Sequence, residues 1–256
     1  MPMTAPRVAG LWRYPVKSLR GEQLAEADVE ADGLRGDRRW GIRDEDTGRI
    51  LTGRREPRLL LGAATMTDDG EPEITLPDGR RVRGAGPASD SALSAWLGRR
   101  VALVPAEGAP GGNAEFFADA TDDDSPAIEW TMPAGRFVDA MPLLVLTTAS
   151  LRAGAALYPA GDWDTRRFRP NLLVELGTEG WIEDGWCGRM LEIGQVAIEP
   201  REPCARCTMV TRPQPGLERD LDIYRTLSRH HGGTFGVWTQ VHTPGTVRVG
   251  DPVVVS

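Results

Sequence analysis

Short apolar runs separated by turn residues predict a chain built mainly from β-strands. In the first hundred residues the candidate strands are 8–12, 24–29, 40–43, 59–61, 63–66, 74–76 and 81–83. The last two flank Pro77-Asp78-Gly79, whose proline and glycine suit the tight turn of a hairpin. Many short strands at this spacing favour a barrel or a sandwich.

Three segments have helical spacing instead. Residues 88–97 predict a short helix capped by Ser89 or Asp90, and residues 149–157 predict a second helix with a threonine cap. A third predicted helix carries apolar residues at Leu217, Leu221, Tyr224 and Leu227 and ends at Gly232-Gly233. The second half also contains candidate strands at 143–146, 172–176, 190–193, 196–198, 235–242, 246–249 and 253–255. The expected fold class is therefore mainly β (α+β) with a few short helices.

The segment 105–135 differs from its surroundings because it is rich in proline, glycine and aspartate and includes Asp122-Asp123-Asp124. This composition predicts a long solvated loop. We expect it to separate two domains, residues 1–105 and residues 106–256.

Charge and cysteine content exclude several classes of protein. The 256 residues carry a net charge of −7, which argues against general nucleic-acid binding, since that requires a basic face. No apolar stretch approaches the roughly 18 residues of a membrane span, and none near the N-terminus has the length of a signal peptide. Three cysteines without a secretion signal predict reduced thiols, so we expect a cytoplasmic protein.

Cys204 and Cys207 concentrate the reactive chemistry of the chain in one C-x-x-C motif. A structural zinc site would need two further ligands, and the remaining Cys187, His230, His231 and His242 have no zinc-site spacing. A thioredoxin-like redox pair normally occurs in a βαβ setting, which this pattern does not show. A third interpretation is one thiolate that ligates a soft metal held mainly by a cofactor, with Arg206 favouring the ionised sulfur. The cysteines could also be two small buried hydrophobic residues.

Three short segments are unusually basic for an acidic chain. They are Tyr14–Ser18, Gly36–Trp40 and Arg167–Asn171. Arginine and lysine side chains at such turns suit a phosphate or a polar heterocycle, because guanidinium groups pair with phosphate oxygens in a bidentate manner. Each segment could equally be a solvated turn.

Taken in order, these segments resemble the MOSC-domain proteins. Similarity to the N-terminal β-barrel found beside MOSC domains comes from Tyr14–Ser18, Gly33–Trp40 and Glu56–Leu59. Similarity to the MOSC β-barrel domain itself comes from Arg167–Asn171, Cys204–Cys207 and Pro244–Val253. The resemblance spans nearly the whole chain. It points to molybdenum enzymes of the mitochondrial amidoxime-reducing component type and their bacterial counterparts.

The resemblance implies a molybdenum–molybdopterin cofactor. In the family the second cysteine of the motif ligates molybdenum, so Cys207 is the expected metal ligand and catalytic residue. The positions that match cofactor-binding positions of the family are Lys17, Ser18, Arg38, Arg169 and Asn171. Thr147 and Ser150 lie in the segment that lines the cofactor after a strand, and Trp238 falls where relatives often have a tyrosine.

Relatives of this kind reduce N-hydroxylated compounds, so the resemblance implies an oxidoreductase for N-hydroxylated or N-oxide-type small molecules. Three cysteines cannot supply the four ligands of a plant-type iron–sulfur cluster, and we expect none in this chain. The electrons should then come from a separate donor, such as a ferredoxin, a flavodoxin or a cytochrome with its reductase. Two alternatives stay open: a carrier that binds the cofactor or sulfur without turnover, and a zinc-stabilised or metal-free interaction protein.

Overall fold

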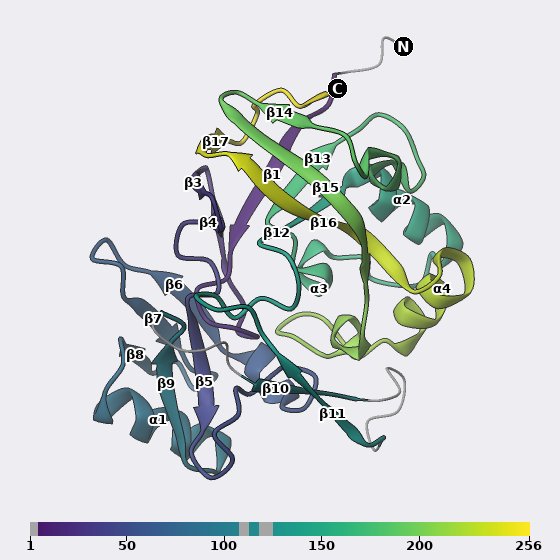
Figure 1. Ribbon diagram of the computed structural model, residues 1–256. Coiled ribbons are helices and arrows are strands. Elements are labelled where there is room, and N and C mark those ends of the chain that lie inside the picture. Colours follow the sequence, from purple (N-terminus) through teal and green to yellow (C-terminus); the bar gives the residue numbers. More distant parts are fainter. Residues whose placement is uncertain (1–4, 108–112, 118–124) are drawn as a thin grey trace.

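The computed structural model describes residues 5–107, 113–117 and 125–256 (Figure 1). Strands make up 38% and helices 21%, which confirms the mainly β fold class. Within the described residues, no helix is both long enough and apolar enough to cross a membrane.

The N-terminal part consists of short strands with one α-helix. In chain order its elements are β1 (Arg7–Arg13), β2 (Glu22–Leu24), β3 (Glu26–Glu30), β4 (Gly33–Leu34), β5 (Trp40–Asp44), the 3-10 helix η1 (Pro57–Leu61), β6 (Ala63–Met66), β7 (Pro72–Thr75), β8 (Arg81–Arg83), α1 (Pro87–Leu97) and β9 (Val101–Pro105). As predicted, β7 and β8 pair antiparallel across the Pro77-Asp78-Gly79 turn.

The remaining elements complete the larger sheet and the helices beside it. They are β10 (Asn113–Phe117), β11 (Ala127–Thr131), β12 (Leu143–Thr147), α2 (Thr148–Leu157), α3 (Thr165–Phe168), β13 (Leu172–Glu175), η2 (Ile182–Trp186), β14 (Leu191–Ile193), β15 (Val196–Ala205), η3 (Thr208–Thr211), α4 (Leu221–His231), β16 (Thr234–Thr243), β17 (Gly245–Arg248) and β18 (Val254–Val255).

One eight-stranded sheet joins the two ends of the chain. Its strand order is β18-β14-β15-β16-β12-β13-β1-β2, so the first strand pairs antiparallel with β13. In a second sheet β3 pairs with β17 near the C-terminus. The first four strands therefore belong to sheets that include strands of the C-terminal part. The division into domains 1–105 and 106–256 stays a prediction from the sequence.

Burial explains the sequence pattern of the sheet. All five residues of β12 are buried, because the strand lies in the middle of the sheet between β16 and β13. A strand covered on both faces reads as a continuous apolar run, as this one does. The residues that form the core of this sheet include Val8, Leu11, Val145, Val174 and Val237. A second core in the N-terminal part packs Leu93 and Leu97 of α1 against β5, β7 and β9.

Three helix and loop predictions need correction. The N-cap of α1 is Gly86, because Ser89 instead bonds the Arg83 carbonyl and Asp90 accepts from the backbone N–H of Leu103. Helix α4 begins after its cap Asp220, so Leu217 lies outside it.

The predicted loop over residues 105–135 contains a hairpin. Strands β10 and β11 pair from Asn113↔Thr131 to Phe117↔Ala127. These two short strands could not be recognised in the sequence because the segment is rich in turn residues. The acidic run Asp122-Asp123-Asp124 lies outside the described residues.

Candidate functional site

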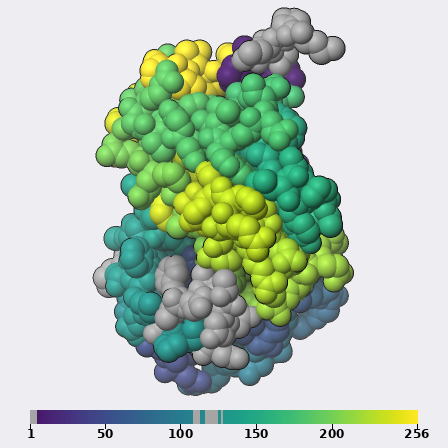
Figure 2. Space-filling view, turned by 90° about the vertical axis from the view of Figure 1, so that its right-hand side faces the viewer, coloured from purple at the N-terminus to yellow at the C-terminus, as the bar shows by residue number. Residues whose placement is uncertain are grey.

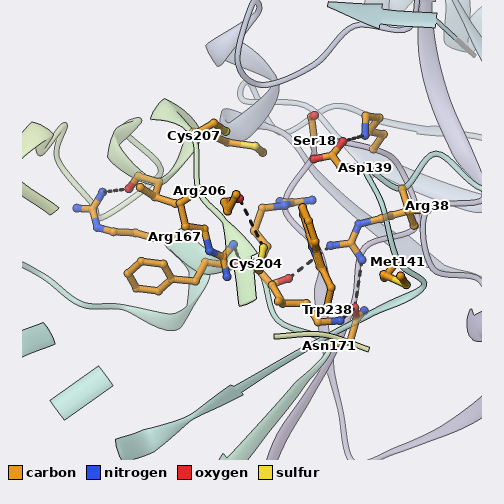
Figure 3. A pocket seen from close by; sticks show the side chains of 18 of the residues that line it. Ser18, Arg38, Asp139, Met141, Arg167, Asn171, Cys204, Arg206, Cys207 and Trp238 are labelled. Atoms are coloured by element: carbon orange, nitrogen blue, oxygen red, sulfur yellow. Dashed lines mark hydrogen bonds and ion pairs between the residues drawn. The ribbon is translucent and has the colours of Figure 1, made fainter. Parts of the chain in front are cut away.

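A pocket lies where the N-terminal and C-terminal parts meet. In Figure 2 most of the green and yellow C-terminal residues lie above the blue N-terminal residues. Both parts line the pocket: Lys17, Ser18, Arg38 and Arg54 come from the N-terminal part, and the other lining residues, among them Asp139, Arg206, Cys207 and Trp238, come from the C-terminal part. Figure 3 shows Arg38, Ser18 and Asp139 across from Arg167 and Arg206.

The structure brings together seven of the nine residues predicted from the sequence. These are Lys17, Ser18, Arg38, Arg169, Asn171, Cys207 and Trp238. They come from the loop after β1, the turn before β5, the α3–β13 junction, the end of β15 and the middle of β16. Segments that are far apart in sequence therefore converge on one pocket.

Three of these residues have an unusual backbone conformation. Among the described residues, the non-glycine positions with positive φ are Ser18 (67°), Arg38 (51°) and Arg169 (54°). The left-handed region costs a residue with a Cβ roughly 1–2 kcal/mol, and such strain often concentrates at functional sites. All three residues line the pocket, which makes it the strongest site candidate in the described chain.

Hydrogen bonds hold these strained positions. The Ser18 Oγ accepts from the backbone N–H of Gly53 at 2.9 Å. Arg38 donates its backbone N–H to the Tyr14 carbonyl at 2.8 Å, and the Arg169 Nη1 donates to the Leu19 carbonyl at 2.8 Å. The left-handed conformations are therefore fixed by the surrounding structure.

The pocket is strongly basic although the chain is acidic. Among the described residues its lining contains six cationic side chains and one carboxylate: Lys17, Arg38, Arg54, Arg167, Arg169, Arg206 and Asp139. Burial lowers the pKa of Lys17, although Asp139 opposes this, and burial lowers the pKa of Arg169 to about 10. A bound anion would favour the charged forms of both side chains, so the pocket suits an anionic ligand.

Lys17 differs from every other basic residue of the chain. It is the only lysine in the sequence, and apart from three histidines the other basic residues are all arginines. Its side chain is buried and donates to the Phe137 carbonyl at 2.9 Å and to Asp139 at 2.7 Å. An ammonium group is a compact point charge, and this is the one place where the chain uses it.

Tyr14 and Asn171 support the part of the pocket that contains Arg38 and Arg169. The guanidinium groups of Arg38 and Arg169 lie over the Tyr14 ring at 4.8 and 4.2 Å from its centroid. Burial raises the pKa of Tyr14 to about 12, so it stays neutral. The Asn171 amide accepts from the backbone N–H of Leu144 and donates to the Trp12 carbonyl, which joins β1, β12 and β13.

The two cysteines of the motif lie in different environments. Cys204 is 4% exposed, and burial raises its pKa to about 11, so it is a neutral thiol at physiological pH. Cys207 is half-buried, and its sulfur accepts a hydrogen bond from the Nε of Arg54 at 2.9 Å. The second cysteine is therefore the better candidate for a ligand.

Arg206 does not make the contact expected from the sequence. Its guanidinium donates to the carbonyl of Phe235 at 2.5 and 2.8 Å and to that of Phe168 at 2.9 Å. Arg206 is adjacent to Cys207 in sequence, but its guanidinium does not contact the Cys207 sulfur because the side chain extends toward β16 and α3. Arg54 supplies the hydrogen bond to that sulfur instead.

Sequence reasoning missed Arg54 and Asp139. Arg54 is 8% exposed and forms a 2.5 Å ion pair with Asp139, which also binds Lys17. Burial alone would raise the pKa of Asp139, but the two cations outweigh it and hold this pKa well below its usual range. The only available signal was that Arg54 lies two positions before the Glu56–Leu59 segment.

Thr147 and Ser150 do not reach the pocket lining. The Thr147 Oγ1 caps α2 by accepting from the backbone N–H of Ser150, which confirms the threonine cap. Both hydroxyls also donate to the fully buried Glu183, at 2.6 and 2.7 Å. Burial raises the pKa of Glu183, and these hydrogen bonds oppose the shift.

A metal cage made only of protein side chains is not found. In the described part of the chain, no three His, Cys, Asp or Glu side chains gather to hold a metal ion. His231 instead bonds Asp184 and the Thr234 carbonyl, and His242 bonds Glu199.

Comparison with known proteins adds to this geometry. The MOSC N-terminal beta barrel domain matches residues 5–117, and the MOSC domain matches residues 134–254. Mitochondrial amidoxime-reducing component 1 from Mus musculus is 30% identical over 96% of this chain and 81% of that protein, and the Homo sapiens protein is 28% identical over 96% and 82%. The molybdenum cofactor sulfurase of Danio rerio is 25% identical over 90% of this chain, but this covers only 31% of that protein.

A solved structure supports the fold alone. The crystal structure of the YUAD protein from Bacillus subtilis matches 99% of this chain and 97% of that one, with a TM-score of 0.50 and 13% identity. The two domain matches and the amidoxime-reducing relatives cover nearly all of the sequence. The chain therefore belongs to the family of MOSC-domain proteins that carry an N-terminal MOSC β-barrel domain, alongside the mitochondrial amidoxime-reducing components.

Proposed function

We propose that the chain binds the molybdenum–molybdopterin cofactor in this pocket and uses it to reduce N-hydroxylated or N-oxide-type small molecules. The observation that carries the proposal is the position of Cys207, whose sulfur lies in a pocket lined by six cationic side chains. The name of the Danio rerio molybdenum cofactor sulfurase supports the cofactor, and the names of the amidoxime-reducing relatives support the reaction.

The residues present fit this group chemically. Thiolate is a soft ligand, and the pterin phosphate suits guanidinium and ammonium groups. Because the described residues contain no cluster of metal-binding side chains, a metal here would take most of its ligands from the cofactor.

The predicted residues that line the pocket have distinct roles in this proposal. Cys207 would supply the sulfur ligand, and Lys17, Arg38 and Arg169 would bind the phosphate and the pterin. Ser18 would fix the loop that carries Arg54, because its hydroxyl already binds the Gly53 amide. The amide of Asn171 is engaged by Leu144 and Trp12, so this residue would act mainly by holding the strands in register.

The substrate would enter beside an apolar wall. Trp238, Met141 and Met209 line the pocket together with the cationic side chains. When bound, the cofactor supplies the redox centre at which an N–O bond is reduced. The overall reaction consumes two electrons and two protons and releases the oxygen as water, and the electrons would come from a separate ferredoxin, flavodoxin or cytochrome-type donor.

The test begins with the cofactor. Protein made in a host that synthesises the cofactor should contain about one molybdenum and one pterin per chain by mass spectrometry, and Cys207→Ala should lose the metal. The loaded protein, supplied with a reduced viologen, should then convert an aromatic amidoxime to the amidine. Zinc, or no metal, from a host that fills another molybdenum enzyme would contradict the proposal. Molybdenum without turnover of any N-hydroxylated compound would favour the carrier function.

A further inference from the structure

Arg54 links the Cys207 sulfur to the charged side chains of the pocket. Its Nε donates to the sulfur at 2.9 Å, while its Nη2 donates to the Asp139 carboxylate at 2.5 Å. Asp139 in turn accepts from the Lys17 ammonium at 2.7 Å. One planar guanidinium therefore contacts the sulfur and the carboxylate at the same time, with a geometry that a lysine cannot reproduce.

The backbone around Arg54 is fixed from three directions. The preceding residue, Gly53, donates its N–H to the Ser18 hydroxyl at 2.9 Å. The Arg54 carbonyl accepts from the Nη2 of Arg212 at 3.2 Å. A Cβ on Gly53 would stand 3.0 Å from the terminal methyl carbon of Met209, so the loop packs tightly against the segment that follows Cys207. The Arg54 side chain is 9% exposed, so it is surrounded by protein on almost all sides.

The contact joins the two matched regions of the chain. Arg54 lies within residues 5–117, whereas Cys207 lies 153 positions later, within residues 134–254. The neighbouring Arg206 donates to the backbone carbonyls of Phe168 and Phe235. The hydrogen bond to the Cys207 sulfur therefore comes from Arg54. The N-terminal barrel thus contributes directly to the ligand atom.

We propose that Arg54 is a positioning residue for the proposed sulfur ligand: it holds the Cys207 sulfur in one orientation and withdraws electron density from it through the Nε hydrogen bond. This inference rests on the proposed function for its redox consequence, but the fixed sulfur position does not require the cofactor. Partners of this kind that orient a metal ligand typically change metal affinity or activity by about 10–100-fold when they are replaced. Hydrogen bonds to a ligating sulfur also raise the reduction potential of the metal.

The test compares Arg54→Gln and Arg54→Lys with the matched control Arg55→Gln. Arg55 is the adjacent arginine, and it pairs with Glu115 outside the pocket. In crystals of the cofactor-free full-length protein, we expect one Cys207 side-chain rotamer in the wild type and in the control, and several in Arg54→Gln. Arg54→Lys keeps the charge near Asp139 but lacks Nε, so it should leave the sulfur equally unfixed.

The loaded protein provides the second readout. The molybdenum midpoint potential, followed by electron paramagnetic resonance of the half-reduced state, should shift to lower values in Arg54→Gln and remain unchanged in Arg55→Gln. Molybdenum retention per pterin should fall about 10–100-fold in Arg54→Gln.

The two proposals fail in different ways. A single, unchanged Cys207 rotamer in Arg54→Gln would overturn the positioning role, whether or not the protein binds molybdenum. An unchanged midpoint potential would overturn the electronic part of the role. Absence of molybdenum from wild-type protein would instead refute the proposed function, while the rotamer comparison would still decide the role of Arg54.

Discussion

The ammonium group of Lys17 lies 2.7 Å from a carboxylate oxygen of Asp139, which stands 122 positions further along the chain. The pair unites the loop after β1 with the segment before β12, at the point where the pocket receives residues from both halves. Lys17 is 6% exposed, so its charge depends on Asp139 and on whatever anion the pocket binds.

Lys17→Met should separate cofactor binding from folding. The substitution removes a buried charge but leaves Asp139 paired with Arg54, so we expect the free energy of unfolding of the cofactor-free protein to change by less than about 1 kcal/mol. A hydrogen bond to a charged group contributes about 1.5–3 kcal/mol, so pterin retention after gel filtration should fall at least about tenfold. Fluorescence of the released pterin measures this.

The single lysine also permits a direct control. An amine-reactive ester can modify only Lys17 and the amino terminus, and peptide mass mapping distinguishes the two. Loaded protein should protect Lys17 while the amino terminus reacts normally. Equal labelling of Lys17 in loaded and cofactor-free protein would show that the anion binds elsewhere.

Asp139 should make the cofactor-free protein sensitive to acid. Arg54 and Lys17 hold the pKa of Asp139 below its usual range in the folded state despite its burial. A carboxylate with a depressed folded pKa contributes stability above its ordinary value of about 3.9, and this contribution is lost as the pH falls further. Asp139→Asn should lower the free energy of unfolding by about 1 kcal/mol at pH 7, since a third of the side chain is exposed.

The same variant should lose less stability than the wild type when the pH is lowered from 7 to 3. Urea unfolding followed by tryptophan fluorescence at both pH values gives the comparison. Parallel losses in the two proteins would mean that other carboxylates account for the acid sensitivity.

Thr147→Val tests whether this residue binds the cofactor or holds the fold. The structure uses its hydroxyl to cap α2 and to bind Glu183, so we expect a loss of about 1–2 kcal/mol in the free energy of unfolding. Molybdenum and pterin content per folded chain should stay at the wild-type level. Normal thermal stability with reduced cofactor content would instead support the direct contact between Thr147 and the cofactor that the family resemblance implies.

Cys204→Ser and Cys207→Ser should differ in metal content. Burial keeps Cys204 a neutral thiol with a pKa of about 11, so the serine variant should retain molybdenum and lose about 1 kcal/mol of stability at most. Cys207→Ser should lose the metal because a hydroxyl is a harder and weaker ligand. Retention of molybdenum in Cys207→Ser with loss in Cys204→Ser would reverse the assignment.

Sequence patterns predicted most of the strands, and the family resemblance pointed to seven of the pocket residues because they belong to short, recognisable segments. Arg54 and Asp139 carried no comparable local signal, since their role depends on contacts with Cys207 and Lys17 from distant parts of the chain. Thr147 shows a different limit. A threonine between a buried strand and a helix has the same sequence context whether its hydroxyl caps the helix or faces a ligand.

Side-chain direction was the hardest property to predict. Arg206 is adjacent to Cys207, yet its guanidinium binds Phe168 and Phe235. The left-handed backbone conformation of Ser18, Arg38 and Arg169 could not be predicted from the sequence either, because none of these residue types prefers positive φ.

The strand order has a consequence for biosynthesis. Strand β1 pairs with β13, and β3 pairs with β17, so each of these early strands pairs with a strand that is synthesised much later. Strands that are so far apart in sequence pair slowly, because the two ends of a long intervening chain must first be brought together. During translation the earliest strands therefore emerge with open edges and no lasting partner. The large sheet is therefore completed only after its last strand in sequence, β18, has been made.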